Sequence, residues 1–153
     1  FQNVRRRMEV RGVVERDDGN ITVYDDFAHH PTAIHTTVDG LRRQLAQSEN
    51  PAAQRILAVF EPRSNTMKLG SMTAQLPWSL EGADLSFCHA GGLDWDAKAA
   101  LAPMGSKAQV ASNIDDLLRQ VMSAVRPGDH LLCMSNGGFG GIHLKLLAAL
   151  KEA

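Results

Sequence analysis

Four short polar segments carry side chains that could bind and activate charged substrates. They are the aspartate pair at 25–26, Glu-Pro-Arg at 61–63, His-Ala-Gly-Gly at 89–92 and Ser-Asn-Gly-Gly at 135–138, and each follows an apolar run. Carboxylates, imidazoles, hydroxyls and an arginine fork are the groups that hold anionic substrates and transfer protons. If the apolar runs are parallel strands of one sheet, their carboxyl ends meet, and the four segments form one ligand site.

The richest polar stretch is DDFAHHPTAI at residues 25–34. His29 and His30 stand directly before Pro31, which fits the first position of a helix. The unpaired N–H groups and the dipole of a helix start favour an anion, to which imidazole can donate. A helix cap or a surface position would explain one histidine, but two after two aspartates favour an anion site. No Cys or His pair has zinc-ligand spacing, so we predict no metal site.

Two further segments are ambiguous on their own. The glycines of NGGFGG at 136–141 permit close backbone approach to an anion, but the segment matches neither nucleotide-binding glycine fingerprint. A tight strand-to-helix connection explains them equally well. Arg63 has a planar fork that suits a carboxylate or a phosphate, while Lys68 stands in the first turn of a predicted helix. A solvated surface charge is the alternative for each of them.

The elements that would position these residues follow from apolar periodicity. Continuous or alternating apolar runs predict strands at 21–25, 55–60, 83–88 and 130–135. Apolar stripes of helical spacing predict helices at 34–45, 69–80, 114–125 and 142–150. We expect a short helix and a further strand at 109–111 in the insert, and an antiparallel strand or hairpin at the N-terminus. The fold class predicted is α/β: a three-layer, Rossmann-like domain with helices on both faces of a mostly parallel sheet.

Composition restricts the classes of function. The 153 residues fit one domain, and 16 basic against 17 acidic side chains give a net charge of −1. The arginines cluster only among residues 5–11, and this cluster is too short to form a nucleic-acid-binding surface. No apolar stretch approaches the ~20 residues that are needed to span a bilayer. Cys88 and Cys133 lie in apolar runs, which favours buried thiols in a reducing compartment. We therefore expect a cytoplasmic protein, monomeric as an isolated domain, with no membrane or nucleic-acid partner.

Several of these segments resemble one family over essentially all 153 residues. The family is the Mur ligases, ATP-dependent amide-forming enzymes of peptidoglycan synthesis, and the resemblance is to their C-terminal domain. RRRMEVRG is similar to the Arg-x-Glu segment that opens this domain. DDFAHHPTAI is similar to its D-Y-A-H-x-P signature. Phe27 replaces the usual tyrosine, so the role of that hydroxyl does not carry over. FEPRSNTMKLG and MSNGGFGGIHLKLL resemble the murein-recycling members, which join L-alanyl-γ-D-glutamyl-meso-diaminopimelate to UDP-N-acetylmuramate.

The resemblance implies roles for individual residues. In the family, ATP phosphorylates the carboxylate of the UDP-linked muramyl substrate, and the incoming amine attacks the acyl phosphate. Arg7, Asp26 and His29 would contact ATP, with Asp26 and His29 taking part in catalysis. Mg²⁺ would be held chiefly by the central domain, so no metal ligand is assigned here. The residues implied in acceptor binding are His30, Thr32, Arg63, Asn65, Ser135 and Asn136.

The resemblance also implies what is missing from these 153 residues. The sequence begins at Phe1 without an initiator methionine and contains neither a Walker-type phosphate loop nor a segment for the uridine nucleotide. We expect a domain of a longer ligase, inactive alone. Two alternatives stay open: the corresponding domain of the L-alanine-adding ligase, whose F-x-P-H-R pattern lacks its histidine here, and a stand-alone anion-binding regulatory module.

Overall fold

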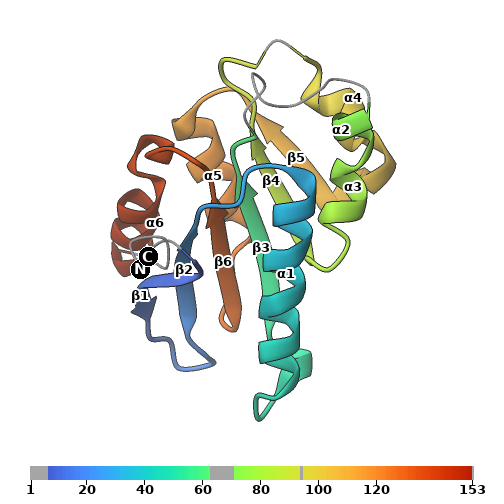
Figure 1. Cartoon of the computed structure of the whole chain (residues 1–153). Helices are drawn as coiled ribbons and strands as arrows, with labels where there is room; N and C mark the ends of the chain where they lie inside the picture. Colours follow the sequence, from blue (N-terminus) through green and yellow to red (C-terminus); the bar gives the residue numbers. More distant parts are fainter. Residues whose placement is uncertain (1–6, 63–70, 94, 153) are drawn as a thin grey trace.

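One mixed sheet forms the centre of the molecule (Figure 1). The computed structural model describes residues 7–62, 71–93 and 95–152. Within them the strand order is β1-β2-β6-β3-β4-β5; β1 pairs antiparallel with β2, and the remaining pairs are parallel. The strands are β1 (Glu9–Val14), β2 (Ile21–Asp26), β3 (Arg55–Phe60), β4 (Leu85–His89), β5 (Ala108–Ala111) and β6 (Asp129–Met134). The predicted parallel sheet and N-terminal antiparallel hairpin are confirmed.

Helices cover both faces of this sheet (Figure 1). On one face lie α1 (Pro31–Ala46), α3 (Leu76–Ser79) and α4 (Ala97–Leu101), and on the other α5 (Ile114–Ala124) and α6 (Ile142–Glu152). Short helical turns complete the connections: η2 (Pro51–Ala53), α2 (Ser71–Ala74), η3 (Ala102–Lys107) and η4 (Phe139–Gly141). The predicted three layers are therefore present.

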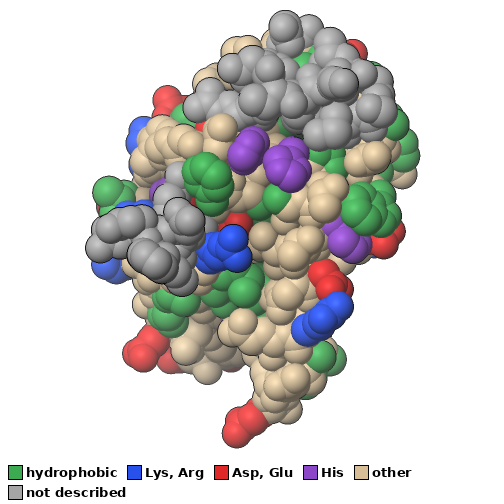
Figure 2. Space-filling view, in the orientation of Figure 1, with side chains coloured by type: hydrophobic (Ala, Val, Ile, Leu, Met, Phe, Trp, Pro, Cys, Tyr) green, Lys and Arg blue, Asp and Glu red, His purple; other side chains and the backbone are tan. Residues whose placement is uncertain are grey.

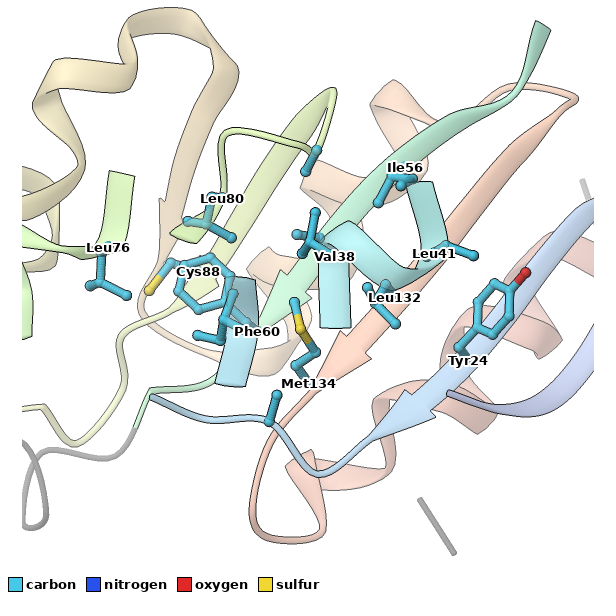
Figure 3. Close-up of a cluster of buried hydrophobic side chains, with 14 of the residues drawn as sticks. Tyr24, Val38, Leu41, Ile56, Phe60, Leu76, Leu80, Cys88, Leu132 and Met134 are labelled. Atoms are coloured by element: carbon cyan, nitrogen blue, oxygen red, sulfur yellow. The ribbon is translucent and has the colours of Figure 1, made fainter. Parts of the chain in front are cut away.

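The two faces have separate cores because side chains alternate along each strand. Phe60, Leu132 and Met134 point to the α1 face, where they meet Val38 and Leu41 of α1 (Figure 3). Their neighbours in the strands point to the α5/α6 face and pack on apolar residues of those helices; this second set includes Val59, Leu131, Cys133, Leu117 and Leu146. Both faces of β3 and β6 are buried, which explains why their sequences are continuous apolar runs.

Two local predictions were wrong. The stripe at 69–80 is not one helix, because α2 ends at Ala74 and α3 begins at Leu76. Pro77 has no N–H to donate to a preceding carbonyl and its ring crowds the preceding turn, so it interrupts the helix. The second concerns the start of α5, where the spacing of Ser112 and Asp115 predicts a capping box. The observed cap lies one residue later: Asn113 Oδ1 accepts from Asp116 N at 2.8 Å.

The two cysteines are free and buried, as predicted. Burial raises the pKa of the Cys88 thiol to about 12, with the nearby charge of Glu61 as a second cause. Burial also raises the pKa of Cys133. Neither thiol is therefore a nucleophile near neutral pH. Within the described ranges, none of the helices combines the length and apolar character needed to cross a bilayer.

Candidate functional site

The polar segments that follow β2, β6 and β3 lie at one edge of the sheet. Ser135 N donates to Asp26 O at 3.1 Å, and Glu61 N donates to Met134 O at 2.9 Å, so hydrogen bonding continues past the strand ends. On the other side of β3, Ala90 N donates to Ala111 O at 2.7 Å just after β4. The shared edge predicted from the sequence is confirmed for the part of the chain that the structure describes.

Side-chain alternation divides this edge into two faces. Side chains two residues apart on a strand point to the same face of the sheet. Asp26 therefore points to the α1 face with Tyr24, and Asp25 points to the α5/α6 face with Val23. By the same alternation, the side chain of Glu61, directly after β3, and that of Ser135, directly after β6, point to the α5/α6 face. The segments thus form two clusters that share a backbone edge.

On the α1 face the edge forms a cavity of about 320 Å³. Its lining includes Arg7, Asp26 and His29, for which the family resemblance implies contacts to ATP, and His30, for which it implies a role in acceptor binding. Figure 2 shows two histidine side chains next to each other on this face, close to a basic side chain. The cavity combines an exposed guanidinium with two partly exposed imidazoles, a donor set that fits a polyphosphate.

Asp26 fixes the loop that builds this cavity. The residue is 5% exposed, and its carboxylate accepts from Met8 N and Ala28 N, both at 2.8 Å, and from the Thr37 hydroxyl at 3.3 Å. Met8 has a φ of +46°, in the left-handed region that non-glycine residues rarely adopt. Because Met8 is joined to Arg7, the Asp26–Met8 contact helps to set the direction from which Arg7 enters the cavity.

The two histidines stand before α1 without capping it through their side chains. His30 is the N-cap residue with extended backbone and makes no side-chain cap bond, and Pro31 is the first helical residue, as predicted. His29 Nδ1 lies 3.1 Å from Phe27 O, and the two imidazole rings meet edge to face at 5.2 Å. The helix start therefore keeps its anion-attracting N–H groups, with both imidazoles beside it.

On the α5/α6 face the edge holds a hydrogen-bonded trio. The Ser135 hydroxyl donates to Glu61 Oε1 at 2.7 Å, and His89 Nδ1 lies 3.0 Å from Glu61 Oε2. Gly137 N donates to Ser135 Oγ at 3.1 Å, which fixes the start of the glycine-rich loop. Ser135 is buried, while the Glu61 and His89 side chains are 17% and 12% exposed.

A second polar group lies on the same face, nearer to β1. His143 Nε2 is 3.1 Å from Asp25 Oδ1, and Arg11 Nη1 is 3.5 Å from Asp25 Oδ2. A cavity of about 340 Å³ lies here between Arg11, Asp25, His143 and glycines of the 137–141 loop. Asp25 is thus engaged with side chains of β1 and α6, not with the cavity that contains Asp26.

Not every predicted site residue joins these clusters. Thr32 is exposed on the first turn of α1, accepts from the Thr36 hydroxyl at 3.0 Å through its carbonyl, and does not line the α1-face cavity. Asn136 follows Ser135 and is partly exposed. Arg63, Asn65 and Lys68 lie outside the described residues.

The sequence had placed Glu61 and His89 after their strands but had given neither an individual role. Their position directly after apolar runs was a signal that could have identified them.

Other parts of the described surface are less suited to this chemistry. A larger hollow of about 520 Å³ lies along β5 and α5, but its lining includes none of the predicted site residues. Over residues 7–62, 71–93 and 95–152, no three His, Cys, Asp or Glu side chains converge in a way that could hold a metal ion. We therefore locate the candidate site at the strand-end edge, where charge and geometry agree.

Comparisons with known proteins show the family of this chain. The family model "Mur ligase, glutamate ligase domain" matches residues 6–137. The chain is 44% identical over 153 residues to the UDP-N-acetylmuramate–L-alanyl-γ-D-glutamyl-meso-2,6-diaminoheptandioate ligase of Escherichia coli strain K12, which covers 99% of this chain and 32% of that protein. The chain therefore spans about a third of the length of this curated relative.

Two solved structures share the fold at similar identity. A murein peptide ligase of Psychrobacter arcticus is 42% identical with a TM-score of 0.78, over 97% of this chain and 30% of that one. A crystallised domain described as part of a UDP-N-acetylmuramate:L-alanyl-γ-D-glutamyl-meso-diaminopimelate ligase from Haemophilus ducreyi is 45% identical with a TM-score of 0.74, over 94% of this chain and 98% of the crystallised one. With a family model matched over most of its length, the chain belongs to the Mur ligase family and corresponds to its glutamate ligase domain.

Proposed function

We propose that this chain is the C-terminal, acceptor-binding domain of an ATP-dependent ligase that joins L-alanyl-γ-D-glutamyl-meso-diaminopimelate to UDP-N-acetylmuramate in peptidoglycan recycling. The observation that carries the proposal is the division of one sheet edge into two polar faces in a chain of this family. The α1 face presents cationic and N–H donor groups, and the α5/α6 face presents a carboxylate, a hydroxyl and a glycine-rich loop.

The α1 face is the part suited to the nucleotide. ATP, when bound, supplies the phosphoryl group that activates the carboxylate of the muramyl substrate. Arg7 would pair with phosphate oxygens, and His29 and His30 would donate to them beside the start of α1. Asp26 would act by holding Met8, and through it Arg7, in place. The Mg²⁺ of the reaction would be held chiefly by the central domain of the ligase.

The α5/α6 face is the part suited to the acceptor. A tripeptide rich in carboxylates and amines needs both donors and acceptors, and the loop that begins at Ser135 and Asn136 lies beside Glu61 here. Arg63 and Asn65 follow β3 in the sequence and would contribute to the same pocket. Similarity to the E. coli tripeptide ligase over the whole chain favours this acceptor over L-alanine.

Activity would require the other two domains of the ligase. A closed active site is assembled from several domains, so the isolated chain would ligate nothing. Because its substrates ATP and a UDP-sugar are cytoplasmic metabolites, the assembled enzyme would work in the cytoplasm. A stand-alone anion-binding module is the second candidate, and a natural polypeptide of only this length would favour it.

A domain exchange tests the proposal. This chain replaces the matching third of the E. coli relative, and ATP-dependent product formation is measured with the tripeptide and with L-alanine. We expect the exchanged ligase to use the tripeptide at least about tenfold better than L-alanine, and the isolated chain to form no product. Preference for L-alanine would refute the acceptor assignment, and loss of all ligation by a folded exchanged enzyme would count against the function itself.

A further inference from the structure

Glu61 is a carboxylate held in one orientation by side chains from two neighbouring strands. It directly follows β3, while Ser135 follows β6 and His89 ends β4, the two strands that pair with β3. Ser135 donates to one carboxylate oxygen at 2.7 Å, and His89 Nδ1 lies 3.0 Å from the other. Each oxygen thus has its own donor from a different strand, and the carboxylate plane is fixed.

The contacts define where protons and charge lie. An ionised carboxylate only accepts hydrogen bonds, so His89 Nδ1 carries the proton in its contact with Glu61. The trio with a neutral His89 therefore has one net negative charge. A carboxylate can accept about four hydrogen bonds, and Glu61 accepts two from side chains of the described residues. Among the described residues, no lysine or arginine forms an ion pair with Glu61.

The surrounding glycines leave room for this arrangement. A Cβ on Gly91 would lie 2.9 Å from His89 Nε2 and 2.7 Å from Ser112 O, so a side chain there would displace the imidazole. Gly137 N donates to Ser135 Oγ, which joins the glycine-rich loop to the trio. Removing a carboxylate from most of its water has a free-energy cost that two neutral donors offset only in part. A partly exposed, oriented anion of this kind suits a cationic ligand.

We propose that Glu61, oriented by Ser135 and His89, binds the one ammonium group of the acceptor's diaminopimelate residue; this inference rests on the proposed function. The diaminopimelate residue has two amines, and acylation by the γ-glutamyl group leaves one of them free. The tripeptide's other amine, on L-alanine, must lose its proton to attack. A carboxylate beside it would favour the protonated form, so Glu61 suits the amine that does not react.

The assignment also gives a physical basis for acceptor choice. L-alanine has a single amine, which is the nucleophile, and therefore offers no second ammonium to Glu61. A charge-assisted hydrogen bond in a partly desolvated site discriminates by about tenfold or more in affinity. Glu61 is thus a specificity-determining residue, and Ser135 and His89 position it.

Titration of the chain with two peptides tests the proposal. The relative from Haemophilus ducreyi was crystallised as a domain of the same extent, so the 153-residue chain is suited to amide NMR. The probes are the tripeptide and an analogue whose third residue is 2-aminoheptanedioate, in which hydrogen replaces the second amine. We expect the tripeptide to bind about tenfold more tightly or better and to shift the amide signals of Glu61, His89 and Gly137.

Matched variants isolate the charge. Glu61→Gln keeps the size of the side chain and one acceptor oxygen but loses the negative charge, so the two peptides should bind within about twofold of each other. Glu81→Gln, an exposed glutamate after α3, should keep the full preference for the tripeptide.

The outcomes separate this inference from the function on which it rests. Equal affinity of the two peptides for the wild-type chain, or an unchanged preference in Glu61→Gln, overturns the role of Glu61 and leaves acceptor binding standing. A wild-type chain that binds neither peptide at millimolar concentration overturns both. The wild-type comparison decides the question even if Glu61→Gln does not fold.

Discussion

Replacing Asp26 by asparagine should release the N-terminal segment from the α1-face cavity while leaving the rest of the loop in place. In the wild type, Oδ2 accepts from Met8 N, and Oδ1 accepts from Ala28 N and from the Thr37 hydroxyl. The amide of Asp26→Asn keeps one acceptor oxygen, which should stay with the two donors. Its NH₂ group then faces the N–H of Met8, so two donors meet and that hydrogen bond is lost.

The size of the effect follows from two opposing contributions. A hydrogen bond to a charged, buried group contributes about 1.5–3 kcal/mol to stability. Met8 is held at a φ of +46°, and a residue in this region stores roughly 1 kcal/mol or more that release would return. The net loss should be about 0.5–2 kcal/mol. For a chain of this size that corresponds to a fall in Tm of about 1–8 °C.

Hydrogen exchange combined with thermal unfolding measures both predictions. In Asp26→Asn the amide of Met8 should exchange much faster, while the amide of Ala28 stays protected, because only one contact is lost. Asp18→Asn, in the exposed turn before β2, serves as the control and should change neither quantity. If Met8 exchanges at the wild-type rate and Tm is unchanged in Asp26→Asn, the carboxylate does not hold the N-terminal segment.

Three other predictions concern binding, backbone geometry and pH. Arg7→Ala should weaken ADP binding by about tenfold in calorimetry, whereas Arg43→Ala, exposed on α1, should leave it unchanged; equal effects would remove Arg7 from the site. Gly128 has a φ of +94°, and a Cβ there would lie 2.2 Å from Ala53 O. Gly128→Ala should therefore lower the free energy of unfolding, measured with urea, by about 3 kcal/mol. A decrease of less than about 1 kcal/mol would contradict this geometry. Burial lowers the pKa of His130 from 6.5. As the pH falls, the imidazole therefore takes up its proton more readily in the unfolded chain than in the folded one. The stability that His130 contributes is present above pH 6.5 and is lost as the pH falls below it. His130→Gln should therefore flatten the pH dependence of unfolding below about pH 6.5, and a profile parallel to the wild type would contradict the shift.

The sheet could be predicted from the sequence because its central strands are buried on both sides. Each of the runs RILAVF and HLLCMS has a continuous apolar stretch after a polar first residue, and both predicted strands lie within one residue of the observed bounds. Helix interruption was harder to predict. The apolar stripe at 69–80 has helical spacing, and the conflict between that spacing and Pro77 is resolved by two short helices in place of one.

The site was predictable as an edge but not as two faces. Polar residues after parallel strands must meet at the carboxyl ends, and this general rule brought Asp26, Glu61 and Ser135 together correctly. The face depends on single-residue alternation, so Asp25 and Asp26 differ in environment although they are adjacent. The contact between Glu61 and His89 depends on β3 lying beside β4, and nothing in the spacing of the sequence states that strand order.

The most direct test of the account compares where two ligands bind on this edge. Amide NMR of the 153-residue chain with ADP and, separately, with the tripeptide maps each ligand onto the two faces. We predict that ADP shifts the signals of residues 26–30, that the tripeptide shifts those of Glu61, His89 and Gly137, and that the two sets scarcely overlap. Signals that move together for both ligands, or that lie away from the strand ends, would contradict the division of the edge into a nucleotide face and an acceptor face.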